Sequence, residues 1–209
     1  QEIQENMTRA QVVQVEQQQT AIELNTRLLE LAQAGYPKAC FSYSKELYSN
    51  LREGKYNYMA KAEQRKLFDM CMDFFATAAR GGVHSAFFYL GLIYLEGIFV
   101  KPDPELAIDC YVKGAAKNNA FCFFELSRLY AEGDLVGGTD NYLQGLYLKR
   151  AAEEGFVTAQ HMLGIAYHDG RIFKRNDRRS LAWFRESVRN GNPVSYLNAG
   201  ELLLEGDPE

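Results

Sequence analysis

The sequence predicts an all-α fold, a solenoid in which antiparallel helix pairs stack on one another. The main observation is that several columns of residues recur every 36 or 37 positions. The columns are the pairs Leu90-Gly91, Leu126-Ser127, Leu163-Gly164 and Ala199-Gly200, the tyrosines Tyr94, Tyr130 and Tyr167, and the glycines Gly97, Gly133, Gly170 and Gly206. A repeat of this length cannot bury its own apolar face and packs on its neighbours. The pattern therefore favours a binding scaffold over a catalyst.

The bulk composition is that of an ordinary soluble globular protein. The chain has 209 residues, of which 47% are hydrophobic and 24% charged, with only 5 prolines. This composition allows a sizeable core and differs from that of disordered chains. The net charge of -4 provides no attraction to nucleic acid or an anionic membrane. No apolar run approaches the roughly 20 residues of a membrane-spanning helix.

Residues 1–34 are rich in glutamine and lack the repeated columns, but their spacing predicts one helix. Gln14 and Gln17 interrupt an apolar series spaced three or four positions apart. The apolar members are Ile3, Met7, Ala10, Ala21, Leu24, Leu28 and Leu31. One interpretation is a helix that caps the first repeat. The other is a coiled-coil or partner-docking helix, because the first half of the stripe is too thin to bury itself on one neighbour.

Each repeat is expected to contain two helices joined by a polar loop. The first helix ends at the Gly97 column, and the second begins at Asp103-Pro104, where an acidic N-cap precedes proline. Asp140 and Asp177 take the place of Asp103 in the later units. The second helix is expected to close on residues that tolerate a left-handed turn, which are Asn119, Gly155 and Gly191.

The glycine inside the first helix predicts a close contact between helices. A mid-helix glycine costs about 1 kcal/mol relative to alanine. Its recurrence as Gly91, Gly164 and Gly200 therefore indicates a position where a neighbour leaves no room for a side chain. Gly54 lies in a loop outside the columns, where we expect a side chain to be tolerated.

These columns resemble the Sel1-like repeat family. Residues 159–191 carry the family pattern as Ala159, Leu163-Gly164, Tyr167, Gly170, Trp183-Phe184 and Gly191, and residues 147–155 carry Tyr-Leu-Lys-Arg-Ala-Ala-Glu-Glu-Gly. The match covers about residues 36–209 and is weaker over 36–82, where the loop around Gly54 is longer. The resemblance implies a right-handed, tetratricopeptide-like superhelix of antiparallel pairs.

The resemblance also divides the chain. Residues 1–34 form the N-terminal helix, and residues 35–209 form a repeat domain. The approximate units are 36–82, 83–119, 120–155, 156–191 and a partial unit over 192–209.

In this family the first helices line the concave side, so their free positions are the candidate partner surface. One position after the alanine of the family pattern, the first helices carry Phe87, Phe123, Gln160 and Tyr196. Three positions after it, they include Tyr89 and Glu125. Aromatic residues there depart from the polar family pattern, and aromatic anchors dominate many binding interfaces. We therefore take Phe87, Tyr89, Phe123, Glu125 and Tyr196 as candidate partner contacts. The alternative is that the rings fill the interior of the stack.

The second candidate is a cluster of basic residues in the loop between two helices of one repeat. It comprises Arg171, Lys174, Arg175, Arg178 and Arg179. Such a cluster is either a solvated loop or a docking point for an acidic peptide, an anionic headgroup or RNA.

No residue pattern indicates catalysis, a metal or a cofactor. The three histidines and four cysteines lack the spacing of a metal site, and no phosphate-binding or nucleophile motif occurs. We expect Cys40, Cys71, Cys110 and Cys122 to be free thiols, with a Cys110–Cys122 disulfide as the alternative.

The sequence thus predicts a non-catalytic scaffold or adaptor. The resemblance implies a subunit of a larger multiprotein assembly, with membrane-associated and organellar assemblies among the options. The alternatives are an RNA-binding solenoid that uses the loop 171–179 and a hydrolase-type enzyme. The expected partners are proteins, bound by the concave face and by the N-terminal helix, rather than nucleic acid. We expect an intracellular protein, cytoplasmic by preference. A mitochondrial or other organellar location stays open because the chain does not begin with Met.

Overall fold

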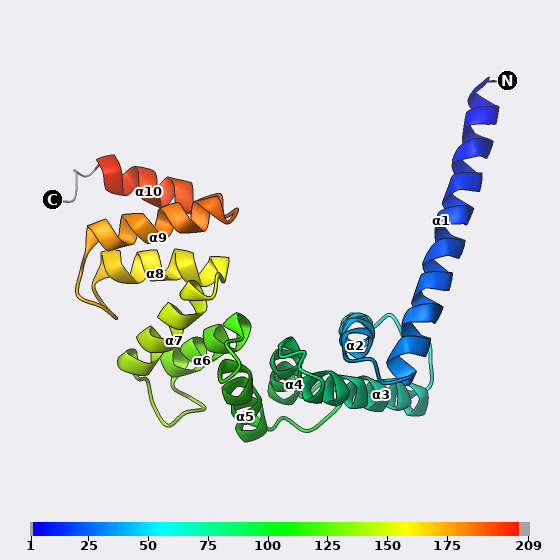
Figure 1. The fold of residues 1–209 in the computed structure, drawn as a ribbon, viewed down its shortest axis with the longest axis horizontal. Helices are drawn as coiled ribbons and strands as arrows, with labels where there is room; N and C mark the ends of the chain where they lie inside the picture. Colours follow the sequence, from blue (N-terminus) through cyan, green and yellow to red (C-terminus); the bar gives the residue numbers. More distant parts are fainter. Residues whose placement is uncertain (1, 205–209) are drawn as a thin grey trace. The chain divides into compact units, whose positions relative to one another are not determined.

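The computed structural model describes residues 2–204, with side-chain surroundings from residue 13 onward, and contains only helices and turns in that range. The helices are α1 (Glu2–Gln33), α2 (Pro37–Arg52), α3 (Lys61–Arg80), α4 (Ser85–Glu96), α5 (Pro104–Ala115), α6 (Ala120–Glu132), α7 (Asn141–Glu153), α8 (Val157–Asp169), α9 (Asp177–Arg189) and α10 (Val194–Leu204). They follow one another as antiparallel pairs, which confirms the predicted all-α class (Figure 1). Within residues 2–204, none of these helices has both the length and the apolar character needed to cross a bilayer.

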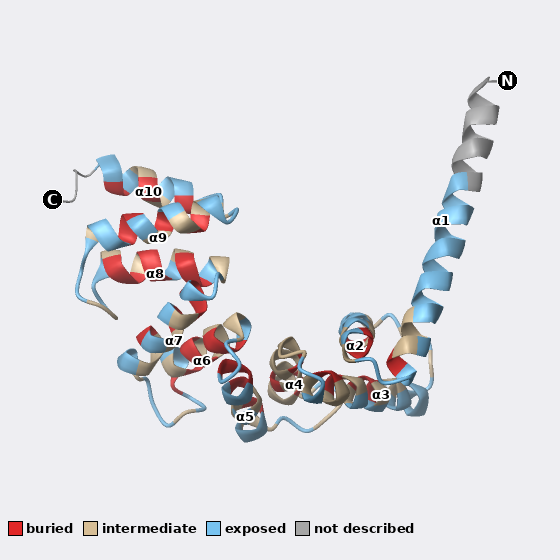
Figure 2. Cartoon of the chain, in the orientation of Figure 1, coloured by how far each residue is buried: buried red, intermediate tan, exposed pale blue. Residues whose placement is uncertain are grey.

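The chain divides into two compact units, residues 1–86 and residues 87–209, with the division inside α4. In the first unit α2 packs on α3, and the C-terminal turns of α1 pack on α2. Its core includes Ala32, Cys40, Phe68 and Phe75, each at most 1% exposed. The α1 side chains from Val13 to Arg27 are exposed, so most of the described part of this helix lies clear of α2 (Figure 2).

In the second unit the pairs α6–α7 and α8–α9 make extensive contacts, and α10 packs on α9. One buried cluster extends from Ala107 and Tyr111 of α5 through Leu126 and Leu148 to Leu163 of α8. The core therefore runs from repeat to repeat, as expected for units that share their apolar faces.

Each second helix closes on a residue with positive φ, but one of these residues is not the one that the sequence suggested. The left-handed residues are Gly82, Asn118, Gly155 and Gly191. Asn119, the residue predicted for this role, has φ -77° and caps α6, accepting a hydrogen bond from the Cys122 amide. Asn118 has φ 57°, a conformation that asparagine tolerates better than most residues.

The N-caps show the same one-residue correction. Asp103 and Asp140 accept hydrogen bonds from the Leu106 and Leu143 amides, as predicted. In α9 the cap is Asn176 rather than Asp177. Asp177 is instead the first helical residue, where a carboxylate is favoured by the helix dipole.

The predicted close approach is confirmed at Gly91 and Gly164, where the neighbour is an aromatic ring. A Cβ on Gly164 would lie 2.6 Å from the Phe184 ring, and a Cβ on Gly91 would collide with the Tyr111 ring. Ser127 replaces glycine in the pair α6–α7, and its hydroxyl donates to the Gln144 carbonyl at 2.9 Å. At Gly200 the prediction of a close contact is wrong: among the residues that the structure describes, no heavy atom outside its own helix backbone and its chain neighbours lies within 4 Å of the position of its Cβ.

All four cysteines are free, as predicted. Cys40, Cys71 and Cys122 are buried, whereas Cys110 is partly exposed. Burial raises the pKa of the Cys71 and Cys122 thiols to about 12 and that of Cys110 to about 11.

The first prediction concerns the glycine column. Gly164→Leu should destabilise the fold by roughly 1–3 kcal/mol, because the side chain would overpack against Phe184. Gly200→Leu is the matched control, because its site is open and leucine favours a helix by up to about 1 kcal/mol over glycine. Thermal melts compare the two, and equal losses would contradict the packing at Gly164. Gly54→Leu, expected from the sequence to be mild, is also strained, since Gly54 has φ +72° and lies against Asn57.

The second prediction concerns the thiols. At pH 8 the raised pKa values leave almost no thiolate, so native protein should react slowly with iodoacetamide at every cysteine. Cys110 should be labelled before Cys122, because it is the partly exposed member of this pair. Timed labelling followed by peptide mass spectrometry measures the order. Rapid labelling of Cys122 would refute its burial.

Candidate interaction surface

The predicted aromatic strip does not form, because one of its members lies in the core. Phe123 is 6% exposed, with the Tyr147 ring 6.3 Å away and the Arg150 guanidinium 5.4 Å above its ring. Tyr147 and Arg150 belong to α7, the second helix of the same repeat. The alternative reading, that rings in this column fill the stack, therefore holds for Phe123.

Gln160 occupies the same column in the next repeat and faces its own second helix too. It is 3% exposed, and its amide donates to the Ala152 carbonyl and accepts from the Asn190 side chain at 2.9 Å. Asn190 is the C-cap of α9. The column thus lies against the second helix of its own pair, and Gln160 also bonds to α7 of the preceding pair, which is why these residues are covered.

The other candidates in α4 and α6 are half-buried. Phe87 packs against the buried cluster, with its Cβ close to Gly114. The Tyr89 ring lies 5.2 Å from the Phe88 ring. The Glu125 side chain is 16% exposed and pairs with Arg128 at 3.0 Å. These positions therefore do not make one open apolar strip with Phe123.

Tyr196 is the one predicted contact that is broadly exposed, at 66%, and it lies on an apolar face of α10. The face that packs on the preceding helices carries Ser195, Ala199 and Leu202. Ser195 shares hydrogen bonds with Ser187 of α9 at 2.9 Å and with His161 of α8 at 2.8 Å, which fixes the rotation of α10.

The outward residues of α10 form the densest exposed apolar group in the second unit. We call them the α10 face: Val194, Tyr196, Leu197, Leu203 and Leu204. Sequence reasoning selected only Tyr196, although the repeat period places Leu203 in the column of Tyr167, which is 6% exposed. The period was the signal that could have found Leu203, since its column is buried in α8 and uncovered in α10. Figure 2 shows the exposed stretches of α10.

A cleft of about 240 Å³ lies between α8, α9 and α10 on the other side of α10. Its polar lining includes His168, Asp169, Asn198 and Glu201. His168 is held by Asp177, with Nδ1 to Oδ1 at 3.1 Å. No cluster of three potential metal ligands occurs in the part of the chain that the structure describes.

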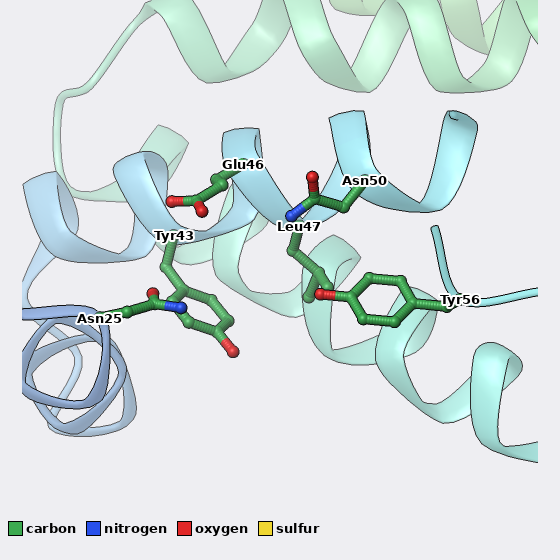
Figure 3. Close-up of a pocket in the computed structure, with 6 residues that line it drawn as sticks. All are labelled: Asn25, Tyr43, Glu46, Leu47, Asn50 and Tyr56. Carbon is green, nitrogen blue, oxygen red and sulfur yellow. The ribbon is translucent and has the colours of Figure 1, made fainter. Parts of the chain in front are cut away.

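The first unit has a small cleft where α1, α2 and the loop after α2 meet (Figure 3). Asn25, Tyr43, Asn50 and Tyr56 line it, and its volume is about 20 Å³. This is room for about one water molecule. Burial raises the pKa of the Tyr43 hydroxyl. The cleft is too small for an organic ligand.

The predicted basic cluster is exposed at all five positions. Arg175 forms an ion pair with Asp177 at 3.0 Å, and the Arg179 guanidinium lies 5.6 Å above the Tyr167 ring. Ile172 and Phe173 anchor the loop, because both lie against Gly145 of α7. The apolar residues of the loop are therefore packed, and its basic side chains are exposed.

The comparisons with known proteins were consistent with this architecture. The model of the Sel1 repeat matches residues 85–119 and 157–192. A Sel1 repeat protein from Oxalobacter formigenes superimposes with a TM-score of 0.71 at 23% identity, covering 87% of this chain and 50% of that one. A protective antigen of uropathogenic Escherichia coli with an SLR fold gives a TM-score of 0.67 at 25% identity, covering 85% of this chain and 36% of that one.

Among curated proteins, chitin synthase regulatory factor 3 of Schizosaccharomyces pombe is 28% identical over 145 residues. That match covers 65% of this chain and 15% of the regulatory factor. The chain thus spans at most half of the length of these relatives.

Proposed function

We propose that this chain, which belongs to the Sel1 repeat family, is a non-catalytic scaffold that binds a protein partner through the α10 face. Sel1 repeats generally mediate protein interactions. The observation that carries the proposal is that five large apolar side chains of one 11-residue helix are each at least 48% exposed. Contiguous apolar surface of this kind usually marks an interaction site in a soluble protein.

The chemistry of the face supports binding rather than catalysis. The α10 face carries alkyl groups and one phenol, and the removal of such groups from water is favourable. A tyrosine among aliphatic residues provides area at a low entropic cost. The regulatory name of the fungal relative is in keeping with an accessory role for this chain.

The basic loop supports a second candidate function, the binding of RNA. Lys174 and Arg178 are exposed and form no ion pair with any residue that the structure describes. Against this candidate, the whole chain has a net charge of -4, which repels a polyanion outside the loop. We therefore rank it below protein binding.

We place this protein in a reducing, intracellular compartment, the cytoplasm by preference. The free, partly exposed thiol of Cys110 supports this location, because such a thiol persists where disulfide formation is suppressed.

The third prediction tests the α10 face. Tyr196→Glu should abolish capture of the partner from a cell extract, because it places a charge in an apolar contact that must be desolvated. Tyr142→Glu is the matched control, since Tyr142 is 76% exposed on α7 and Tyr196 is 66% exposed. Both variants should keep the wild-type melting temperature. Quantitative mass spectrometry of the captured proteins measures the difference.

Two results would count against the proposal. Equal capture by the two variants would remove α10 from the interface. A lower melting temperature for Tyr196→Glu alone would mean that the residue is part of the folded core rather than of an interface.

The fourth prediction separates protein binding from RNA binding. At physiological salt the chain should not be retained by single-stranded RNA, because its net charge is negative. If retention occurs, a Lys174→Ser, Arg178→Ser double variant should weaken it, and Arg185→Ser, an exposed arginine of α9, should not. Salt-dependent retention that only the double variant loses would favour the RNA candidate.

A further inference from the structure

The cleft between α8, α9 and α10 combines buried apolar residues with two exposed carboxylates. Phe184 and Leu202 line it at 2% and 4% exposed, and Ile165 packs against both. Asp169 of α8 and Glu201 of α10 line its two walls and are exposed. Its volume of about 240 Å³ is below the roughly 300–1,000 Å³ of small-molecule pockets. The cleft is therefore of the size for one long side chain.

We propose that this cleft binds the side chain of an arginine of a partner protein. The guanidinium lies between Asp169 and Glu201, and the methylene stem lies on Ile165 and Leu202. None of these residues belongs to the α10 face, so this site is additional to the one already proposed.

The first argument is that the negative charge of the cleft is not neutralised within the chain. Asp169 and Glu201 form no ion pair with any residue that the structure describes. The neighbouring basic groups, His168 and Arg175, both bind Asp177, at 3.1 and 3.0 Å. Asp169 is also the last residue of α8, where the helix dipole places partial negative charge. A carboxylate at this end disfavours the helix, and a bound cation offsets that cost.

The second argument comes from the same columns in α6, where the chain supplies the cation itself. Glu132 lies 37 positions before Asp169 and pairs with Arg128 of its own helix at 2.6 Å. The column of Arg128 reads Leu92, Arg128, Ile165 and Glu201. The carboxylate is thus kept in α8, but the arginine that binds it in α6 is replaced by isoleucine. An arginine of another protein can take that place.

The third argument is that later helices of the chain leave these columns open. Asn198 and Glu201 take the columns of Met162 and Ile165. Although α9 and α10 both follow α8, Met162 is 40% exposed and Ile165 is only partly buried. The contact of α9 with α8 lies on other columns, such as that of Gly164. The side of the first helices that lines the cleft is therefore accessible inside the stack.

A guanidinium fits this cleft better than other cations. It is planar and weakly hydrated, so it can lie against apolar residues and donate two hydrogen bonds to a carboxylate. Asp169 on one wall, and Glu201 with the side-chain oxygen of Asn198 on the other, provide acceptors. The ammonium of lysine is more strongly hydrated. No group of three metal ligands occurs among the residues that the structure describes.

The test is an NMR titration of the isotope-labelled full chain with Nα-acetylarginine N-methylamide. The citrulline analogue has the same shape without the charge and is the matched control, and the lysine analogue compares the two cations. We expect saturable shifts of the Asp169, Asn198 and Glu201 amides with the arginine analogue. The lysine analogue should bind more weakly, and the citrulline analogue should give no saturable shift.

Two isosteric variants remove the charge of the cleft. Asp169→Asn and Glu201→Gln should each raise the dissociation constant of the arginine analogue about two- to fivefold, the range for partly exposed ion pairs. Asp134→Asn, at an exposed position outside the cleft, should leave it unchanged. All three variants should keep the wild-type melting temperature, because none of these carboxylates is buried.

A third variant fills the cleft from within the chain. Ile165→Arg restores the arginine of the Arg128 column beside Asp169, so it should abolish binding of the arginine analogue. Thr158→Arg adds the same charge at an exposed position of α8, about two turns away, and should not abolish binding. If Ile165→Arg lowers the melting temperature, the isosteric variants decide.

Several results would overturn the proposal. They are equal binding of the citrulline or the lysine analogue, shifts that lie outside the cleft, and binding that neither Asp169→Asn nor Glu201→Gln weakens. Self-association of the chain that Ile165→Arg abolishes would assign the cleft to a second copy instead of a partner. Tyr196→Glu should bind the arginine analogue like the wild-type chain, so the cleft and the α10 face can fail separately.

Discussion

The contact on which each helix pair depends is the one between the middle of its first helix and a buried side chain of its second. At Gly91 and Gly164 the backbone comes so close to an aromatic ring that a Cβ cannot be accommodated. This contact requires the two helices to face each other at one residue, and the other columns follow from it. Gln160 and Phe123 face the second helix because they lie one turn before the contact, and Tyr167 and Tyr130 do so one turn after it. At Gly91 and Gly164 the burial of an aromatic ring offsets the helix stability that a mid-helix glycine loses.

The connection between two pairs and the connection inside a pair differ in length and in how strongly their conformation is fixed. The connection from a second helix to the next first helix is short and is fixed by a left-handed residue, with hydrogen bonds such as Gly155 N to the Ala152 carbonyl and Phe156 N to the Ala151 carbonyl. This is the usual closure of a helix by a residue with positive φ. The connection inside the pair is longer, and it is the place where the units differ, as in the loop 170–176, which carries both apolar anchors and cations. Variation is therefore confined to the exposed positions of this loop, since Ile172 and Phe173 pack against the core.

The fold could be predicted from the sequence because the repeat period gives several independent estimates of each helix. The errors were of two physical kinds. Adjacent residues with the same capping chemistry cannot be separated by pattern alone, which is why Asn118 and Asn119, and Asn176 and Asp177, were assigned one position out. The other error concerned whether a side chain points to solvent or into the core. An aromatic residue at a usually polar position can be an exposed anchor or a buried one, and Phe123 is buried because Tyr147 and Arg150 cover it. Tyr196 was found, but the open contact at Gly200 needed coordinates.

The regular placing of left-handed residues at Asn118, Gly155 and Gly191 also divides this part of the chain into intervals that each contain one helix pair. Cutting and rejoining the chain at these residues brings together ends of similar conformation, so duplication or loss of one interval leaves the contacts inside each remaining helix pair unchanged and alters only those between pairs. Copy number can then change during evolution in a single recombination event, with the glycine or asparagine acting as the splice point. The length of such a protein, and with it the number of surfaces that it offers, is for this reason one of its most easily altered properties.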